Sequence, residues 1–223
     1  MTDAAPVMTT PSPARDARWK VPAAVVVVLL VLGGLGGWLL WPDEEPVVAV
    51  PAKVCEASLP GGAVKGLVPE RGEKFREENA YNFATAGHSP EAVRRWGLGQ
   101  CQLTGGGASV KVEYRLLQGG DYTRADVDTD ARESGSTPLA LGAAGGYLKG
   151  PGAHLFVDCP VRPGGDELLE VSVGVGGNGA DEKDRAVRSS ASALAADAAR
   201  HVARDIRRCP GAENLPSGPP RIG

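Results

Sequence analysis

The sequence lacks the residues that most zinc sites and nucleic-acid-binding surfaces need. It contains three histidines, His88, His154 and His201, and none has a second histidine or a cysteine at the spacing of zinc ligands. Its four cysteines are far apart, unlike the close ligand pairs of a zinc ribbon. The formal net charge of −3 provides no basic field for nucleic acid. We therefore expect neither a zinc protein nor a nucleic-acid-binding protein.

Motifs for catalysis are equally scarce. No G-x-S-x-G segment marks a serine nucleophile. Residues 174–179 match G-x-G-x-x-G between a predicted strand and a predicted helix. A dinucleotide-binding fold needs a second parallel strand after that helix, and here the helix ends at Cys209 and Pro210. The glycines are better explained as a flexible connector, so we expect no cofactor and no catalytic residue of a known type.

A short acidic segment imitates a calcium loop without completing it. Asp126, Asp128 and Asp130 have the spacing with which such a loop begins. Ala131 stands where the loop needs glycine, and Thr137 stands where it needs a bidentate glutamate. A solvated acidic loop is the simpler interpretation, and the sequence predicts no metal site.

The longest apolar run predicts a membrane span. Residues 21–41 carry no charge, and as a helix they are about 31 Å long, which matches a hydrocarbon core of about 30 Å. Trp19, Trp38 and Trp41 stand at the two ends, where indole rings prefer the headgroup level. The segment also lacks the polar stripe of a buried amphipathic helix. It predicts a transmembrane helix in a lipid bilayer.

The flanking charges orient this span. Arg15, Arg18 and Lys20 precede it, whereas the acidic residues 43–45 follow it. Basic residues stay on the cytoplasmic side, so residues 1–20 form a cytoplasmic tail and the rest lies outside the cell. The apolar run is longer than a signal-peptide core and no clean cleavage site follows it. An uncleaved signal anchor is therefore expected.

Small residues within the span allow self-association. Gly33 and Gly37 form a G-x-x-x-G pair on one helix face. Such pairs let two transmembrane helices approach closely. A homodimer through the span is one interpretation, and an ordinary glycine-rich apolar segment is the other.

The outer part divides into a spacer, a domain and a tail. Residues 42–51 read as an extended, proline-bearing spacer. Residues 52–210 are long enough for one folded core, and residues 211–223 have the composition of a disordered tail.

The cysteines all fall within the predicted outer domain. Cys55, Cys101, Cys159 and Cys209 are an even number on the oxidising side of a membrane, which predicts two disulfides. Three connectivities are possible. We favour Cys55–Cys101 and Cys159–Cys209, because each links a strand to the helical segment nearest to it in chain order.

Alternating apolar residues predict two β-hairpins. The first joins residues 95–103 to 109–117 across three glycines, and the second joins residues 154–161 to 168–175. Segments 139–141 and 147–149 add short strands. Period-two alternation means that each strand buries one face.

Helical spacing predicts one long helix and two short ones. From Asp184 to Arg208 the apolar positions recur every three or four residues, and many are alanine, so this helix should lie close to the sheet. A shorter helix is expected between Pro60 and Pro69, and another after Ser89 as its N-cap. The fold class is α+β: an antiparallel sheet packed with a long C-terminal helix.

The arrangement resembles small membrane-anchored proteins of unknown function that streptomycetes and related actinobacteria encode. The resemblance rests on Arg15 and Arg18 in a proline- and alanine-rich tail, the end of the span at residues 38–41, Cys55-x3-Leu59-Pro60, and the close from His201 to Cys209-Pro210. It covers the whole chain and implies a membrane location. It implies no activity.

These features predict a non-catalytic extracytoplasmic binding or scaffolding module. Its partner would be an envelope protein or a cell-wall component, and the polar stretches 70–92 and 118–137 are the expected contact loops. The alternative is an envelope hydrolase with unrecognised catalytic residues. A deep pocket containing a buried acid or histidine would favour that alternative.

Overall fold

The computed structural model describes residues 45–118, 120 and 122–223. The predicted cytoplasmic tail, the predicted span at residues 21–41 and the Gly33–Gly37 pair lie outside the described residues. In the part that is described, no helix is long and apolar enough to cross a membrane. The predicted spacer is described from residue 45 onward, and Val47 there forms an antiparallel bridge with Arg71.

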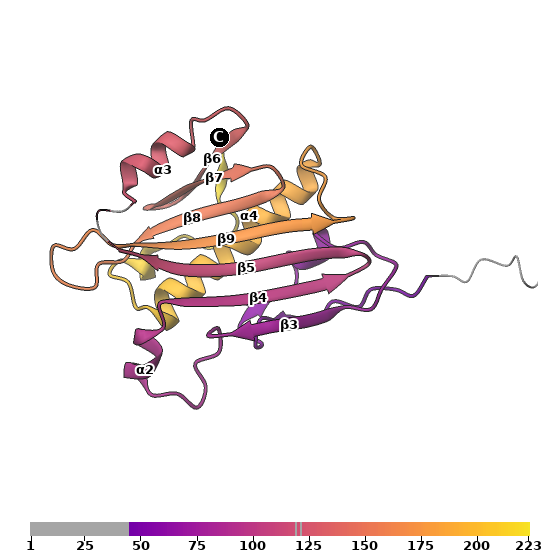
Figure 1. Cartoon of the computed structure of the whole chain (residues 1–223), viewed down its shortest axis with the longest axis horizontal. Helices are drawn as coiled ribbons and strands as arrows, with labels where there is room; N and C mark the ends of the chain where they lie inside the picture. The colour runs from indigo at the N-terminus through magenta and orange to yellow at the C-terminus, as the bar shows by residue number, and fades with distance from the viewer. Residues whose placement is uncertain (1–44, 119, 121) are drawn as a thin grey trace, which may run out of the picture. The chain divides into compact units, whose positions relative to one another are not determined.

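A large antiparallel sheet organises the described domain (Figure 1). The strand order across the described residues is β10-β6-β7-β8-β9-β5-β4-β3, and β1 and β2 form a separate small ribbon. The strands are β1 (Lys53–Val54), β2 (Leu59–Pro60), β3 (Arg76–Tyr81), β4 (Leu98–Gly105), β5 (Ala108–Leu117), β6 (Ser136–Leu141), β7 (Ala144–Lys149), β8 (Gly152–Asp158), β9 (Leu168–Gly177) and β10 (Arg221–Ile222).

Helical segments are fewer and mostly short. The α-helices among the described residues are α2 (Pro90–Arg95), α3 (Arg124–Asp130) and α4 (Arg185–His201), and α4 continues into the π-helical turn η2 (Val202–Ile206). Two 3-10 turns complete the set, η1 (Val64–Gly66) and η3 (Ala212–Asn214). The fold is α+β, as the sequence predicts.

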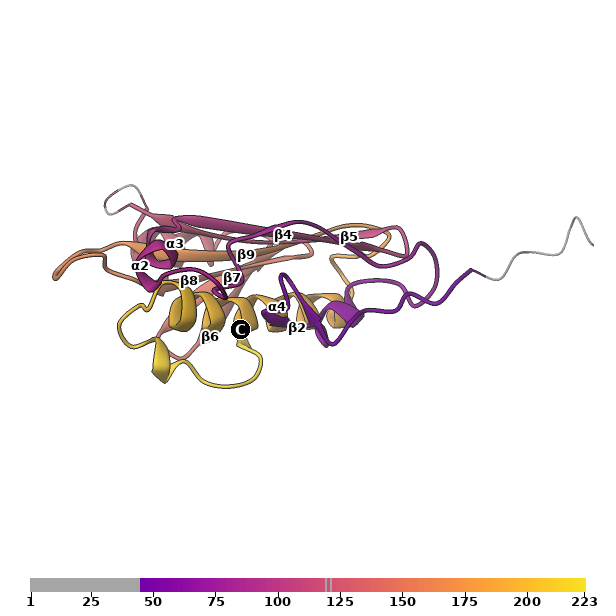
Figure 2. The same cartoon turned by 90° about the horizontal axis from the view of Figure 1, so that it is seen from below.

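Alternation along the central strands creates one apolar face. On β5, Val110, Val112 and Tyr114 are buried, and on β9 the buried Val171 and Val173 pair with Tyr114 and Val112. These side chains point toward α4, which lies along this face in Figure 2. The face that α4 covers is called the covered face below, and the opposite one the uncovered face.

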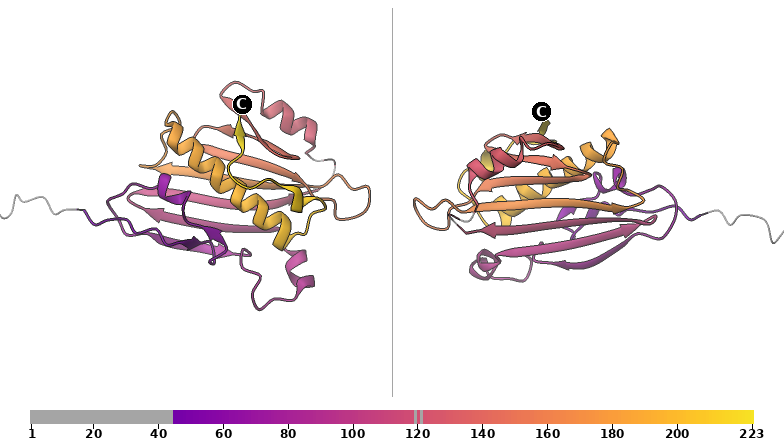
Figure 3. Two further views of the ribbon diagram at one scale, coloured as in Figure 1. Left: turned by 180° about the vertical axis from the view of Figure 1, so that it is seen from behind. Right: turned by 45° about the horizontal axis from the view of Figure 1, so that its top comes forward.

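Helix α4 lies close to the sheet because its contact residues are small. Its buried residues include Ala191, Ala195 and Ala198, and Leu194 is also fully buried. The carboxylate of Asp184 caps the helix by accepting a hydrogen bond from the Ala186 N–H at 2.7 Å. Figure 3 shows α4 crossing the covered face, with the β1–β2 segment and the C-terminal segment beside it.

Two disulfides fasten the covering layer to the sheet. Cys101 on β4 is bonded to Cys55, which lies between β1 and β2, and the Cα atoms are 5.5 Å apart. Cys159, just after β8, is bonded to Cys209 beyond the end of the long helix, with a Cα separation of 4.6 Å. This is the pairing that the sequence analysis favours.

The turn around Cys55 has an unusual backbone. Cys55, Glu56 and Ala57 all have positive φ, between 55° and 59°. This left-handed conformation is unfavourable for residues with a Cβ. The Glu77 carboxylate compensates by accepting hydrogen bonds from the Cys55 and Glu56 N–H groups, both at 2.7 Å. The turn is thereby fixed to β3.

Helix α3 covers a small part of the opposite face. It packs over a second apolar cluster made of Val127, Tyr147, Phe156 and Leu168. Arg124 ties α3 to β8 by donating hydrogen bonds to the Phe156 carbonyl at 3.1 Å and to Asp158 at 2.7 Å. The rest of this face, toward β3, carries no helix among the described residues (Figure 3).

The prediction of a disordered tail at residues 211–223 is wrong. Strand β10 pairs with β6, and Leu215 is buried in the main core. Arg204 donates a hydrogen bond to the Ala212 carbonyl at 2.8 Å, and Arg200 donates one to the Gly218 carbonyl at the same distance. Two arginines of the long helix thus satisfy carbonyl groups of a segment whose composition alone indicates disorder.

The two stretches expected to be loops are also more regular than predicted. Stretch 70–92 contains the edge strand β3 and the start of α2, and stretch 118–137 contains α3 and the start of β6. The capping box of Thr123 and Asp126 that starts α3 was not recognised in the sequence. The helix expected between Pro60 and Pro69 is only the turn η1.

Candidate functional site

A row of polar side chains crosses the uncovered face. Strand pairing places the members of this row opposite one another on successive strands. The row runs through Tyr147, His154, Ser172, Glu113, Gln100 and Tyr81. Outward positions of a sheet with one covered face tolerate polar residues, so the same alternation that builds the core also builds this row.

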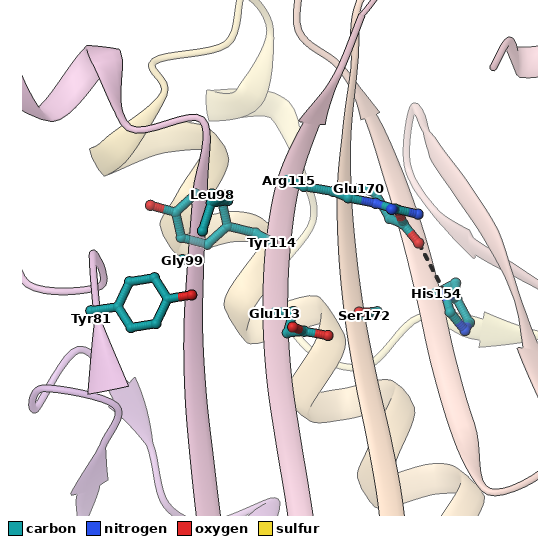
Figure 4. A pocket seen from close by; sticks show the side chains of 9 residues that line it. All are labelled: Tyr81, Leu98, Gly99, Glu113, Tyr114, Arg115, His154, Glu170 and Ser172. Atoms are coloured by element: carbon teal, nitrogen blue, oxygen red, sulfur yellow. Dashed lines mark hydrogen bonds and ion pairs between the residues drawn. The ribbon is translucent and has the colours of Figure 1, made fainter. Parts of the chain in front are cut away.

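A cavity of about 450 Å³ opens on this face (Figure 4). Tyr81 extends over β4 from one side, and His154 lies on the other side. Leu98, at the start of β4, contributes an apolar wall and is 53% exposed. The residues lining the cavity are Tyr81, Leu98, Gly99, Glu113, Tyr114, Arg115, His154, Glu170 and Ser172.

A buried carboxylate organises the charges of the cavity. Glu170 is only 6% exposed, yet it belongs to the uncovered face. One of its oxygens lies 3.2 Å from Nδ1 of His154, and the other accepts a hydrogen bond from Nε of Arg115. Burial alone would raise the pKa of Glu170, but the hydrogen bonds from His154 and Arg115 outweigh it and lower that pKa. Glu170 is therefore an anion at neutral pH.

The position of His154 is fixed from two sides. Its ring stacks on Tyr147, with centroids 5.0 Å apart and planes at 25°. Tyr147 in turn donates a hydrogen bond to Asp130 of α3 at 3.3 Å, and Tyr122 donates another to the same carboxylate. Burial raises the pKa of Tyr147 and of Tyr122, so both remain phenols. With Nδ1 engaged by Glu170, the histidine has Nε2 left for a ligand.

Ser172 is the serine that strand pairing brings next to this histidine. It stands opposite His154 on the neighbouring strand. Among the described residues no hydrogen bond joins the two side chains, and Figure 4 draws none. A nucleophilic serine needs that bond to transfer its proton. The arrangement therefore contains the residue types of a triad without the bond that would activate one.

The other histidines have structural surroundings. His201 lies with Nε2 2.8 Å from the Phe83 carbonyl and Nδ1 2.9 Å from Asp205. His88 contacts Trp96 edge-on at 4.9 Å between ring centroids. Neither lines the cavity.

Part of the glycine motif of residues 174–179 serves close packing of the chain. Gly177 has φ +66°, and a Cβ there would lie 2.2 Å from the Gly107 carbonyl oxygen. Asn178 donates a backbone hydrogen bond to the same carbonyl at 3.1 Å. Gly177 therefore lets the end of β9 approach the turn between β4 and β5, whereas a Cβ at Gly174 or Gly176 would meet no atom within 4 Å.

The acidic segment that imitates a calcium loop forms helix α3 instead. Asp126 closes the capping box, and hydrogen bonds from Thr123 lower its pKa. Asp130 accepts from the two tyrosines described above. Over the described part of the chain, no three or more His, Cys, Asp or Glu side chains are placed to bind a metal ion.

No family model, curated protein or solved structure matches this chain. The candidate site therefore rests on its own geometry.

Sequence reasoning did not bring Arg115, His154 and Glu170 together, because β5, which carries Arg115, is distant in sequence from the predicted hairpin that carries the other two. One signal was present: Glu170 interrupts an otherwise apolar stretch at an outward position of β9. A buried acid inside a strand requires a partner on a neighbouring strand. The hairpin partner of β9 is predicted by the sequence, but its pairing with β5 becomes known only with the fold.

Proposed function

We propose that the described domain is a non-catalytic binding or scaffolding module on the outer side of a cell membrane, anchored by residues 21–41. Its partner is an envelope protein or a cell-wall component that contacts the uncovered face of the sheet. The observation that carries this proposal is the cavity of about 450 Å³ whose charges are already positioned by the buried Glu170.

The geometry favours binding because little has to be ordered when a ligand arrives. Glu170 is fully engaged, and this engagement fixes both Arg115 and His154. The remaining N–H groups of Arg115 and Nε2 of His154 are left for hydrogen bonds with a ligand. Preorganised groups bind more tightly since their entropy has already been lost on folding.

The two polar stretches named by the sequence lie on opposite sides of the cavity. Tyr81, from stretch 70–92, lines it directly. Stretch 118–137 provides α3, whose Asp130 accepts the hydrogen bond of the Tyr147 that stacks on His154. Both stretches therefore belong to the same proposed recognition surface, although they are a strand and a helix rather than loops.

The two disulfides support a location outside the cytoplasm, because such bonds persist in oxidising compartments. A periplasm-active alkaline phosphatase fused after Gly223 tests the topology. Fusion at this point keeps the packed residues 211–223 intact. We expect an active reporter; an inactive fusion, or a mature chain that begins near residue 50, would contradict the anchor.

Photo-crosslinking in cells tests the binding surface. A photoreactive amino acid replaces Leu98 in the cavity and, as a control, Ser217, which is exposed on the C-terminal segment beside α4. We expect a specific crosslinked partner from position 98 and none from position 217. Equal capture at both positions, or at neither, would contradict recognition by the uncovered face.

An envelope hydrolase is the second candidate, because the buried acid Glu170 lies in one cavity with His154 and Ser172, the kind of site that favours a hydrolase. It comes second because no hydrogen bond joins His154 to Ser172 among the described residues. If the domain were a hydrolase, the purified protein would cleave an ester or peptide substrate, and Ser172→Ala would abolish the cleavage. Turnover that depends on Ser172, without a crosslinked partner, would replace the binding proposal.

A further inference from the structure

A second cavity, of about 530 Å³, lies at one end of the sheet and is rich in arginine. It is formed where the link from α2 to β4, the end of β5, the β8–β9 loop and the end of η2 meet. Its lining includes Arg94, Arg95, Arg162 and Arg207, and it is called the arginine cleft below.

The acidic groups near the arginine cleft do not neutralise it. Glu167 is the one carboxylate in the lining, and it is buried and accepts a hydrogen bond from the Val161 N–H at 3.1 Å. Arg95 pairs with Glu91 at the solvent-exposed surface of α2. Arg94 and Arg162 have no carboxylate partner within the described residues. The cleft thus keeps an excess of positive charge in a chain whose net charge is −3.

Arg207 adds a partly buried cation to the lining of this cleft. Its Nη1 donates hydrogen bonds to the carbonyl groups of Arg94 and Trp96, the second at 3.0 Å. Its Nε is buried and has no acceptor among the described residues. Burial lowers the pKa of Arg207, and no carboxylate among the described residues forms an ion pair that compensates its charge. An anion in the cleft would supply that compensation.

The arginine cleft lies at the end of the domain remote from the chain entry. Residues 45–50 pack at the other end of β4, where Val48 contacts Gly105. The cleft lies at the Gly97 end of that strand, and eight strand residues span about 26 Å. Figure 1 shows α2 and the β8–β9 loop at one end and the indigo start of the domain at the other.

We infer that the arginine cleft binds phosphodiester groups of an anionic cell-envelope polymer. Tetrahedral phosphate oxygens can accept hydrogen bonds from several guanidinium groups at once. A lipid headgroup offers the same chemistry, so the test below includes one arm for each source of phosphate. The location of the ligand in the cell envelope rests on the proposed function, whereas the anion chemistry rests on the cleft alone.

The inference is tested with the purified full-length chain in detergent, with both disulfides intact. The measurement is its binding of a soluble poly(glycerol phosphate). The variant Arg94→Gln with Arg162→Gln removes two exposed guanidinium groups that make no ion pair in the described structure. The matched control Arg132→Gln with Arg185→Gln removes the same charge from exposed positions outside the cleft. Titration calorimetry at low and at physiological salt measures the affinity.

We expect the cleft variant to bind at least about tenfold more weakly than the wild type, and the control to change by less than about threefold. Equal losses in the two variants would show a nonspecific charge effect and overturn the site. Absence of binding to the wild type at low salt would overturn it as well. Thermal unfolding provides a second readout, because inorganic phosphate should raise the Tm of the wild type and the control but not of the cleft variant.

Vesicles of phosphatidylglycerol, with phosphatidylcholine vesicles as the blank, distinguish the two sources of phosphate. Preference for the polymer supports the inference; preference for the vesicles overturns the assignment to a wall polymer. The crosslinking at position 98 probes the other cavity, so its outcome and that of this titration are read separately.

Discussion

The two faces of the sheet arise from the same alternation of residues but are stabilised in different ways. The covered face buries Val110, Leu155 and Val171 beneath α4, and both disulfides join that layer to the sheet. The uncovered face depends on hydrogen bonds and ion pairs around Glu170 and on one small apolar cluster. Apolar burial therefore provides most of the stability on one side, which leaves the other side able to carry polar recognition groups.

Removing a disulfide should have the largest effect, because it loosens the covering layer. The double substitution Cys159→Ala and Cys209→Ala opens a loop with a sequence separation of 50. In the chain-entropy model this lowers the free energy of unfolding by about 4 kcal/mol. Urea denaturation measures it, and an unchanged midpoint would mean that the disulfide does not stabilise the fold.

Shortening a buried side chain in the middle of α4 should have the next largest effect on the free energy of unfolding. Leu194 is fully buried against the sheet, so Leu194→Ala should lower the free energy of unfolding by about 3 kcal/mol. On the uncovered face, Gln100→Ala should change it by less than about 0.5 kcal/mol. Similar losses for the two variants in urea denaturation would contradict the energetic difference between the faces.

Loss of the buried charge should have a smaller effect that depends on pH. Glu170→Gln removes an acceptor of charge-assisted hydrogen bonds, so we expect the free energy of unfolding to fall by about 1–2 kcal/mol at neutral pH. The pKa of Glu170 is lowered in the fold from its ordinary value of 4.5. Its contribution is therefore complete above pH 4.5 and is lost as the pH falls through the lower folded value.

The difference between wild type and Glu170→Gln should accordingly shrink as the solution is acidified below pH 4.5. Denaturation curves at a series of pH values measure this. A difference that stays constant, or that grows on acidification, would show that the carboxylate is not stabilised by His154 and Arg115.

The smallest effect is expected at the start of α3. The Thr123 hydroxyl accepts a hydrogen bond from the Asp126 N–H at 3.4 Å and donates one to the Asp126 carboxylate. Thr123→Ala should therefore lower the free energy of unfolding by about 1 kcal/mol. The control is Ala125→Ser, a substitution at a neighbouring exposed position that leaves the capping box intact. A loss as large as that of Leu194→Ala would mean that α3 supports the main core rather than one end of the uncovered face.

Local sequence patterns predicted the elements whose contacts are close along the chain. The two hairpins, the alanine-rich stripe of α4 and the Ser89 cap of α2 can be read from spacing and capping residues. Strand β3 and helix α3 were missed because their residues are polar and little buried. Their stability comes from partners distant in sequence, such as the pairing of β3 with β4 and the hydrogen bonds from Arg124 to β8.

The sequence by itself determined which residues alternate, which helix has an apolar stripe and which cysteines can form disulfides. The first two depend on the local spacing of apolar residues, and the third depends on the even number of cysteines. The tertiary structure alone decided that β5 and β9 are neighbours, which brings Arg115 to Glu170 and His154 to the same cavity. It also decided that residues 211–223 pack against α4, since the carbonyl groups there find Arg200 and Arg204 only after the long helix has docked.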